Sequence, residues 1–233
     1  MNMKKFFSGL LAAVSLFGFC TLGFVSKAEE VPEQNVQEEK VVKDTELVFI
    51  IDQSGSMSGL RDDTIGSFNA VIEQQKKDKD HGKVYVTTVM FSDKHTKVHD
   101  REDIENIKEM TRDDYRPCGC TALLDAVGDT LSGLRNVEGI KDRNVVVAII
   151  TDGYENASKE YKKSDVKSLI ESSQKDGWKV MYYGAGVDAF SDKAGAGLGI
   201  TKDRLFTVGH SQAGVKDMFG CICNEVTATR TGN

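Results

Sequence analysis

The sequence predicts an α/β protein of three layers: a doubly wound, mostly parallel central sheet with helices on both faces, of the Rossmann-like kind. Two observations predict it. Short apolar runs alternate along the chain with longer stretches in which apolar side chains recur at helical spacing. The apolar runs are also continuous rather than alternating, which is typical of strands buried on both faces of a parallel sheet. With 233 residues, the chain has room for one such domain and additional segments.

Each element follows from its local pattern. Residues 46–51 (ELVFII) and 144–150 (NVVVAII) are the clearest strands, and the segment 83–91 is rich in β-branched and aromatic residues. Further strands are expected at residues 178–183 and 204–208, with a short edge strand near 96–98. Helices are expected at residues 65–76, 123–131, 164–175 and 213–226, with a helical turn near 104.

The N-terminal segment is typical of an export signal. Lys4 and Lys5 precede an apolar run over residues 6–25, and the small residues Ser26 and Ala28 fit a cleavage site. The alternative is a retained membrane anchor, because the run just reaches the ~20 residues that a spanning helix needs. We therefore expect a secreted or cell-envelope protein. The expected divisions are a signal at 1–28, a flexible acidic linker at 29–44, the domain at 45–228 and a tail at 229–233.

The charge distribution argues against nucleic acid as a partner. Residues 1–28 hold three lysines and no acidic residue, so the remainder carries 27 basic against 36 acidic residues. An acidic domain of this kind repels phosphate backbones. Contact with a membrane is expected only through the N-terminal segment, if it is not cleaved.

Three loops at the expected carboxyl edge of the sheet carry oxygen ligands. The first strand runs into Asp52-Gln53-Ser54-Gly55-Ser56, the strand 144–150 runs into Thr151-Asp152-Gly153, and Thr121 opens a helix between them. In open α/β sheets, ligands bind at this edge. Two carboxylates and three hydroxyls form an all-oxygen set that suits Mg²⁺ or Mn²⁺. The alternative is that these side chains only cap the helices that follow.

The segments IIDQSGSMS, GCTALLDAVGD and VVVAIITDGYEN resemble, in this order, the three metal-loop motifs of the von Willebrand factor type A (VWA) domain. The resemblance covers residues 46–226 and is strongest to single-domain bacterial members. It implies that Asp52, Ser54, Ser56, Thr121 and Asp152 form a metal-ion-dependent adhesion site (MIDAS). It also implies a protein-binding module, without catalytic residues, that binds an Asp or Glu of a partner protein through the metal.

Residues close to these motifs have two interpretations each. Asp125 either supports the site through hydrogen bonds or is a first-turn acid near a helix N-terminus. Glu155 and Asn156 either line the rim of the site or cap the helix that follows. His81 and His210 are expected to face solvent.

Four cysteines outside the N-terminal segment form two C-x-C pairs, Cys118 with Cys120 and Cys221 with Cys223. In an exported chain an even number suggests disulfide bonds. We expect bridges from the Thr121 loop to the closing helix, in either pairing; free thiols and local C-x-C bridges are the alternatives. A weaker hypothesis is a zinc site of His95 and His99 with the cysteines.

The sequence contains neither a G-x-S-x-G nucleophile motif nor a P-loop. Residues 184–189 match a loose dinucleotide fingerprint, but they follow a late strand, which favours a plain tight turn. We therefore expect a binding protein rather than an enzyme. The alternative is a metal-dependent or thiol-redox-regulated envelope enzyme or assembly factor.

Overall fold

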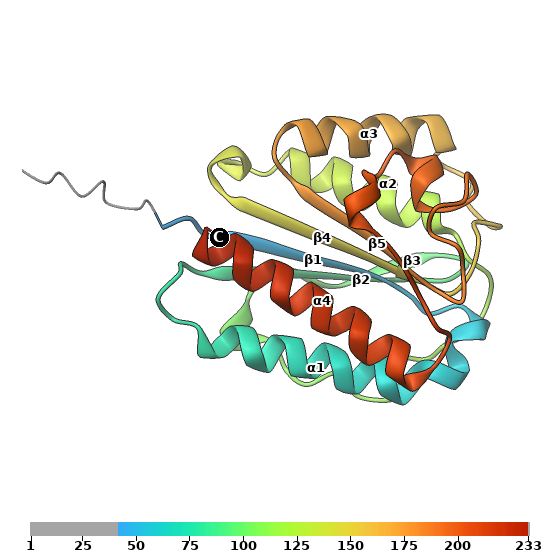
Figure 1. Ribbon diagram of the computed structural model, residues 1–233, viewed down its shortest axis with the longest axis horizontal. Helices are drawn as coiled ribbons and strands as arrows, with labels where there is room; N and C mark the ends of the chain where they lie inside the picture. The colour runs from blue at the N-terminus through green and yellow to red at the C-terminus, as the bar shows by residue number, and fades with distance from the viewer. Residues whose placement is uncertain (1–41, 233) are drawn as a thin grey trace, which may run out of the picture. The chain divides into compact units, whose positions relative to one another are not determined.

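A computed structural model describes residues 42–232 of the chain, and its centre is a six-stranded sheet (Figure 1). The export signal expected at 1–28 and most of the linker expected at 29–44 lie outside the described residues. The spatial order of the strands is β3-β2-β1-β4-β5-β6. The strands are β1 (Thr45–Asp52), β2 (Val84–Phe91), β3 (His95–Asp103), β4 (Asn144–Thr151), β5 (Lys179–Ala185) and β6 (Leu205–Val208).

All neighbouring strands are parallel except the pair β2 and β3, which is antiparallel. In the central pairings Ile51 lies opposite Met90 on one side and Ile150 on the other. The carboxyl ends of β1, β2 and β4 therefore meet at one edge of the sheet. The expected mostly parallel sheet is confirmed.

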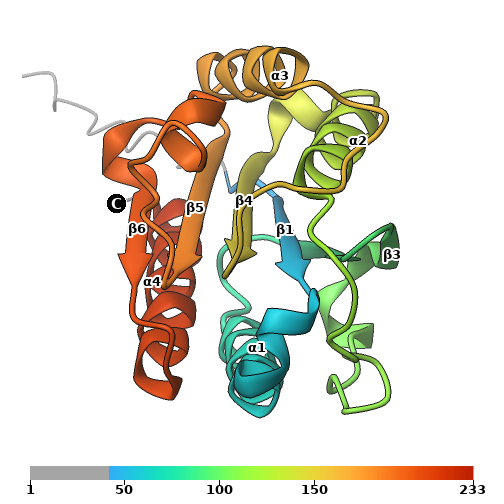
Figure 2. The ribbon, with the colours of Figure 1, turned by 90° about the vertical axis from the view of Figure 1, so that its right-hand side faces the viewer.

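Four α-helices complete the two outer layers, with α1 and α4 on one face and α2 and α3 on the other (Figure 2). Strand β1 shows why both faces are covered: Phe49 packs in the cluster under α1 and α4, and Ile50 in the cluster under α2 and α3. The helices are α1 (Arg61–Lys77), α2 (Leu123–Arg135), α3 (Lys163–Lys175) and α4 (Gln212–Thr231).

Two elements differ from the sequence expectation. Strand β3 extends over nine residues, HTKVHDRED, because an edge strand pairs on one side only and tolerates polar side chains. Helix α4 continues to Thr231, so residues 229–231 belong to it and not to the expected tail. No helix within residues 42–232 has the length and apolarity needed to span a membrane.

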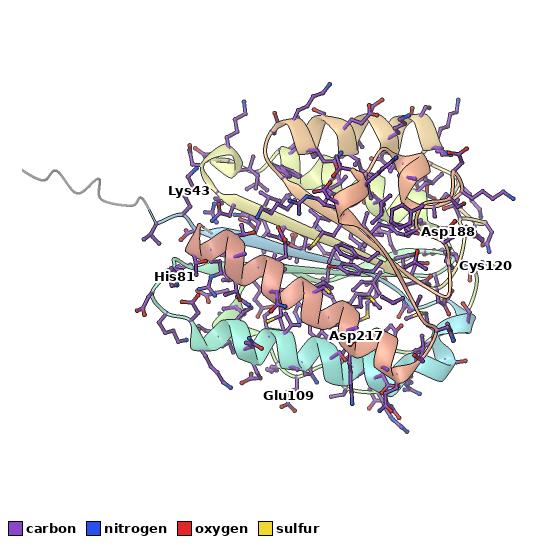
Figure 3. All side chains as sticks on the ribbon, in the orientation of Figure 1. Lys43, His81, Glu109, Cys120, Asp188 and Asp217 are labelled. Carbon is purple, nitrogen blue, oxygen red and sulfur yellow. The ribbon has the colours of Figure 1, made fainter. Side chains whose placement is uncertain are left out.

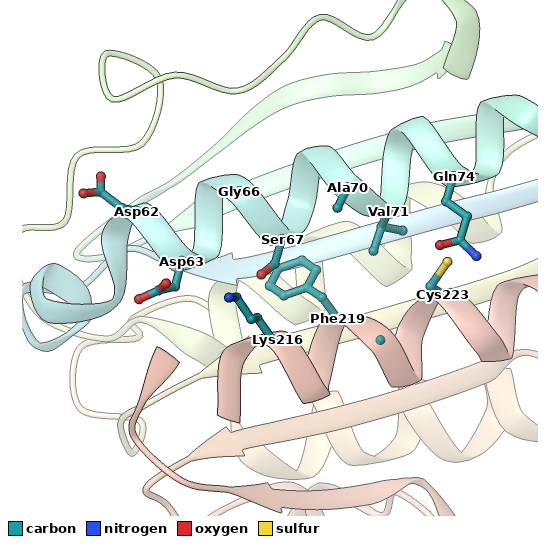
Figure 4. Close-up of a pocket in the computed structure, with 11 residues that line it drawn as sticks. Asp62, Asp63, Gly66, Ser67, Ala70, Val71, Gln74, Lys216, Phe219 and Cys223 are labelled. Carbon is teal, nitrogen blue, oxygen red and sulfur yellow. The ribbon is translucent and has the colours of Figure 1, made fainter. Parts of the chain in front are cut away.

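The disulfide bonds expected between the Thr121 loop and the closing helix are absent, and this expectation is wrong: all four cysteines within residues 42–232 are free thiols. Cys118, Cys120 and Cys221 are exposed, whereas Cys223 is buried. The reason is the direction in which α4 presents Cys223. Its Sγ faces α1, where the Gln75 side-chain amide donates to it at 3.4 Å. Cys223 also lines a cavity of about 480 Å³ between α1 and α4 (Figure 4).

The amino end of β1 is held by a buried acidic residue. The Glu46 carboxylate has no exposed surface and accepts hydrogen bonds from the guanidinium groups of Arg101 at 2.8 Å and Arg143 at 2.9 Å. Both guanidinium groups also lie over the ring of Tyr85, at 5.8 and 4.6 Å. An isolated buried carboxylate is strongly unfavourable, so each partner is needed.

Replacing Glu46 by alanine should destabilise the fold, because it leaves two partly buried guanidinium groups without their acceptor. We expect Glu46→Ala to lower the free energy of unfolding by about 3 kcal/mol, measured by urea denaturation. The control is Glu105→Ala, which removes an exposed ion pair with Lys79 and should change stability by less than about 1 kcal/mol. Equal effects of the two substitutions would contradict this account.

Candidate metal centre

Three of the predicted residues come together at the end of β1 and in the loop that follows it. The Asp52 carboxylate is fully buried, and its Oδ1 accepts a hydrogen bond from the backbone N–H of Ser54 at 2.7 Å. The hydroxyls of Ser54 and Ser56 lie 3.1 Å apart. The chain then enters a 3₁₀ helix over Gly55–Leu60, which leads directly into α1.

The second loop joins the first across the β1–β4 pairing. The Thr151 hydroxyl donates to Oδ2 of Asp52 at 2.6 Å, and the Ser56 hydroxyl donates to Oδ1 of Asp152 at 2.6 Å. The two bonds connect residues that are 99 and 96 positions apart in the chain. They follow from the register, because Ile51 lies opposite Ile150.

Thr121, from the third loop, lies at the same place. A Cβ added at Gly153 would lie 3.2 Å from Oγ1 of Thr121 and 4.0 Å from Oδ2 of Asp52. Gly153 therefore leaves open the space between the Thr121 hydroxyl and the Asp52 carboxylate. The structure brings all five predicted residues to one edge of the sheet.

Two buried acidic side chains, Asp52 and Asp152, lie close together at this edge, and their negative charges are unfavourable there. Burial raises the pKa of Asp52, and hydrogen bonds from Thr151 and Ser54 counter this only in part. The nearby Asp152 carboxylate raises the pKa of Asp52 further, and the Asp152 side chain itself has no exposed surface. A divalent cation would balance both negative charges, so the donor set fits a hard metal ion.

The loop that follows β4 holds Thr121 in place. The Asn156 side-chain carbonyl accepts from the Thr121 N–H at 2.9 Å, while the Asn156 N–H donates to the Thr121 carbonyl at 3.0 Å. On the other side of the loop, the Ala122 N–H donates to the Ser92 carbonyl at 2.7 Å. Asn156 thus clamps a ligand residue from another loop, which is neither of the two roles that the sequence suggested for it.

Asp125 and Glu155 connect the same two segments in opposite directions. The Asp125 carboxylate accepts from three successive backbone N–H groups, those of residues 159–161, at 2.8 to 2.9 Å. Burial disfavours the charged form of Asp125, but these donors outweigh it and hold the pKa of that carboxyl below its usual value. Glu155 accepts from the N–H of Leu124 at 2.9 Å, in the first turn of α2, a helix without a side-chain cap of its own. Asp125 therefore has the supporting role, and Glu155 caps α2 rather than the helix that follows it.

Sequence reasoning missed two contacts at the site. His210 is exposed, as expected, and its Nε2 also lies 2.9 Å from Oδ2 of Asp152. Tyr115, fully buried, donates its hydroxyl to the Asp52 backbone carbonyl at 2.6 Å. Both residues lie far in sequence from the aspartates they contact, and no local pattern marks them.

A zinc site of histidines and cysteines finds no support. His95 Nε2 instead lies 2.9 Å from Oδ2 of Asp129 on α2. Within residues 42–232, no group of three or more His, Cys, Asp or Glu side chains is placed to hold a metal. The five residues described above differ from such a group because three of their oxygen donors are hydroxyls.

A comparison with protein families identifies the class. Residues 20–198 match the model of the family described as "VWA domain containing CoxE-like protein". The chain belongs to this VWA family, as the loop motifs implied. No curated protein sequence matches the chain.

Solved structures from several organisms have the same fold. The vWF domain of the type V pili tip protein Mfa5 from Porphyromonas gingivalis is similar with a TM-score of 0.59 at 10% identity, over 81% of this chain and 96% of that one. The pilus adhesin SpaC from Lactobacillus rhamnosus GG, in an open conformation, has a TM-score of 0.60 at 13% identity, over 80% and 30%.

A third similar structure is that of proximal thread matrix protein 1 from the mussel byssus, described as having a zinc-occupied MIDAS motif. Its TM-score is 0.56 at 17% identity, over 80% of this chain. The similarity spans 47% of the mussel protein's length. At these identities the structures establish the shared fold.

The close approach of α2 to the β4–α3 loop can be tested with two glycines of α2. A Cβ at Gly128 would lie 2.4 Å from the ring of Tyr161, whereas a Cβ at Gly133 meets nothing within 4 Å. We expect Gly128→Ala to lower the free energy of unfolding by about 1–3 kcal/mol through overpacking. Gly133→Ala should raise it by about 0.5–1 kcal/mol, because alanine is the better helix former. Urea denaturation measures both, and stabilisation by Gly128→Ala would contradict the described contact.

Proposed function

We propose that this protein is a metal-dependent protein-binding module that holds Mg²⁺ or Mn²⁺ and binds an acidic side chain of a partner protein. The observation that carries the proposal is the pair of unexposed carboxylates, Asp52 and Asp152, at one edge of the sheet. Each accepts a hydrogen bond from a hydroxyl of the other loop: Asp52 from Thr151, and Asp152 from Ser56. Two negative charges without exposure are unfavourable unless a cation balances them.

The ligands would be Asp52, Ser54, Ser56, Thr121 and Asp152. Only two of them are charged, so together they neutralise a divalent cation and no more. The bound cation would supply a Lewis-acid position that a partner carboxylate can occupy in place of water. The role of the protein is to fix the five oxygens, and the Asn156 clamp on Thr121 and the Thr151 bond to Asp52 do this.

Similar proteins support this proposal without identifying the partner. One of the similar structures is described as a pilus adhesin and another as having a zinc-occupied MIDAS motif. Oxygen ligands without a thiolate or imidazole favour Mg²⁺ or Mn²⁺ over zinc in this chain. We further propose export to the cell envelope or secretion, on the pattern of residues 1–28. Nucleic acid is not a proposed partner, because the remainder of the chain is acidic.

A metal-dependent enzyme is the second candidate, and the position of His210 favours it. Imidazole is the side chain most often used as a general base, and His210 Nε2 lies 2.9 Å from the Asp152 carboxylate. We propose binding rather than catalysis because that contact directs this nitrogen at a proposed ligand and not at open space.

Binding of Mn²⁺, followed by electron spin resonance of the free ion, tests the proposed site. We expect the wild-type protein to remove about one equivalent of the free signal. Asp152→Ala and Thr121→Ala should each weaken binding by at least about tenfold, because each removes a ligand.

The matched control is Asp217→Ala, which removes an exposed carboxylate on α4 and should leave Mn²⁺ binding unchanged (Figure 3). Circular dichroism confirms that the variants are folded. Absence of binding by the folded wild-type protein, or equal loss in the Asp217 variant, would contradict the proposed site.

A further inference from the structure

A small cavity of about 240 Å³ lies beside the candidate metal centre. Its wall comes from the start of α2, the loop after β4, the start of α3 and the segment 192–198. The residues that matter for the inference are Leu123, Leu124, Tyr154, Lys163, Lys193 and Leu198. Leu123 and Leu198 are buried, so the floor of the cavity is apolar.

Two sides of the cavity continue the loops that carry the proposed ligands. Leu123 is two residues beyond Thr121, and Tyr154 is two residues beyond Asp152. Consecutive Cα atoms are ~3.8 Å apart, so each pair of Cα atoms is separated by less than about 8 Å. In an extended partner segment, residues one or two positions from the acidic residue lie at a similar distance from it. Their side chains can therefore reach this cavity while the acidic residue lies at the metal.

One exposed aromatic side chain lines the cavity, and a second is close to the lining in the sequence. Among the described residues, the exposed large hydrophobic side chains are those of Val42, Val98, Tyr154 and Phe190. Tyr154, 42% exposed, lines the cavity, and Phe190 precedes its lining residue Asp192 by two positions. Tyr154 thus offers an apolar surface that a partner side chain entering the cavity can contact.

The charged groups at the cavity are balanced and do not select the charge of the partner. Glu155 lines the cavity, but its carboxylate is already occupied by donors from Leu124, Ala157 and Ser158. Lys193 has no ion-pair partner in the part of the chain that the structure describes. Lys163 and Asp192 line the cavity as well, so its lining carries two charges of each sign. The acidic residue of the partner is therefore required by the metal and not by the cavity.

The size of the cavity fits one side chain. A cavity of ~150 Å³ in another protein holds a benzene molecule, whereas sites for drug-sized ligands begin at ~300 Å³. At about 240 Å³, this cavity has room for a phenylalanine or leucine side chain. It is too small for a nucleotide or a comparable cofactor.

We propose that the cavity lined by Leu123, Leu124, Tyr154 and Leu198 is a specificity subsite for an apolar side chain next to the metal-bound acidic residue of the partner. This inference rests on the proposed function, because the metal-bound carboxylate positions the apolar neighbour. The partner is thus a protein with an exposed segment in which Glu or Asp lies one or two residues from an aromatic or branched aliphatic residue.

The test uses fluorescent peptides with a Gly/Ser background and one central Glu, with Phe, Leu or Ala placed one or two positions before or after it. Binding to the full chain in saturating Mn²⁺ is measured by fluorescence anisotropy. At the best position, Phe should bind about tenfold more tightly than Ala, because burial of an aromatic side chain has at least this effect. Tyr154→Ala and Leu124→Gln should each reduce this preference to about threefold or less.

The matched control for these variants is Val98→Ala, which alters an equally exposed apolar residue on β3, away from the cavity, and should keep the full preference. Peptides with Gln in place of Glu separate the two proposals. If Glu and Gln peptides bind equally, the proposed function fails, and this inference fails with it. If binding requires Glu and Mn²⁺ but Phe and Ala peptides are equal, only the subsite is overturned. A Phe preference that persists in both cavity variants also overturns it.

Discussion

The parallel pairing of β1 with β4 is the constraint on which the candidate site depends. Because Ile51 lies opposite Ile150, the two strands end at the same height. Asp52, the last residue of β1, and Asp152, the residue after β4, are therefore brought to one place. The Thr151 hydroxyl bridges to Asp52 across this pairing at 2.6 Å. A shift of the register by one residue would turn the side chains of the shifted strand to the opposite face and separate the two carboxylates.

The remaining parts of the site depend on a second layer of contacts that involves mainly one loop. Residues 155–161 cap α2 through Glu155, clamp Thr121 through Asn156 and are themselves held by the Asp125 carboxylate. Thr121 therefore needs no regular secondary structure of its own to be fixed. The five oxygens belong to three loops, but the hydrogen bonds among those loops make them a single unit.

Much of the fold was predictable, because buried parallel strands such as 144–150 are apolar along their whole length. The mostly parallel sheet and all four helices follow from such local patterns, and the motif residues Asp52, Thr121 and Asp152 are conspicuous at loop positions. The extent of β3 was not predictable, since an edge strand needs no apolar face. The His210 contact and the Asn156 clamp depend on which loops meet in space. The disulfide prediction was wrong for a related reason. An even number of cysteines does not show in which direction α4 presents the Cys223 side chain.

The buried ion pairs of Glu46 with Arg101 and Arg143 bear on which end of the molecule is accessible to a partner. They fix the amino end of β1, whereas the oxygen ligands lie at the carboxyl end, six residues and about 20 Å further along the strand. The last turns of α4 lie at the same end as Glu46, since Asn144 donates to the Thr229 carbonyl. Figure 3 shows Lys43 and His81 at this end of the molecule and Cys120 at the opposite end. A surface or a fusion partner attached at residue 42 or at residue 232 would therefore lie at the Glu46 end. The oxygen ligands at the opposite end would stay accessible to another molecule.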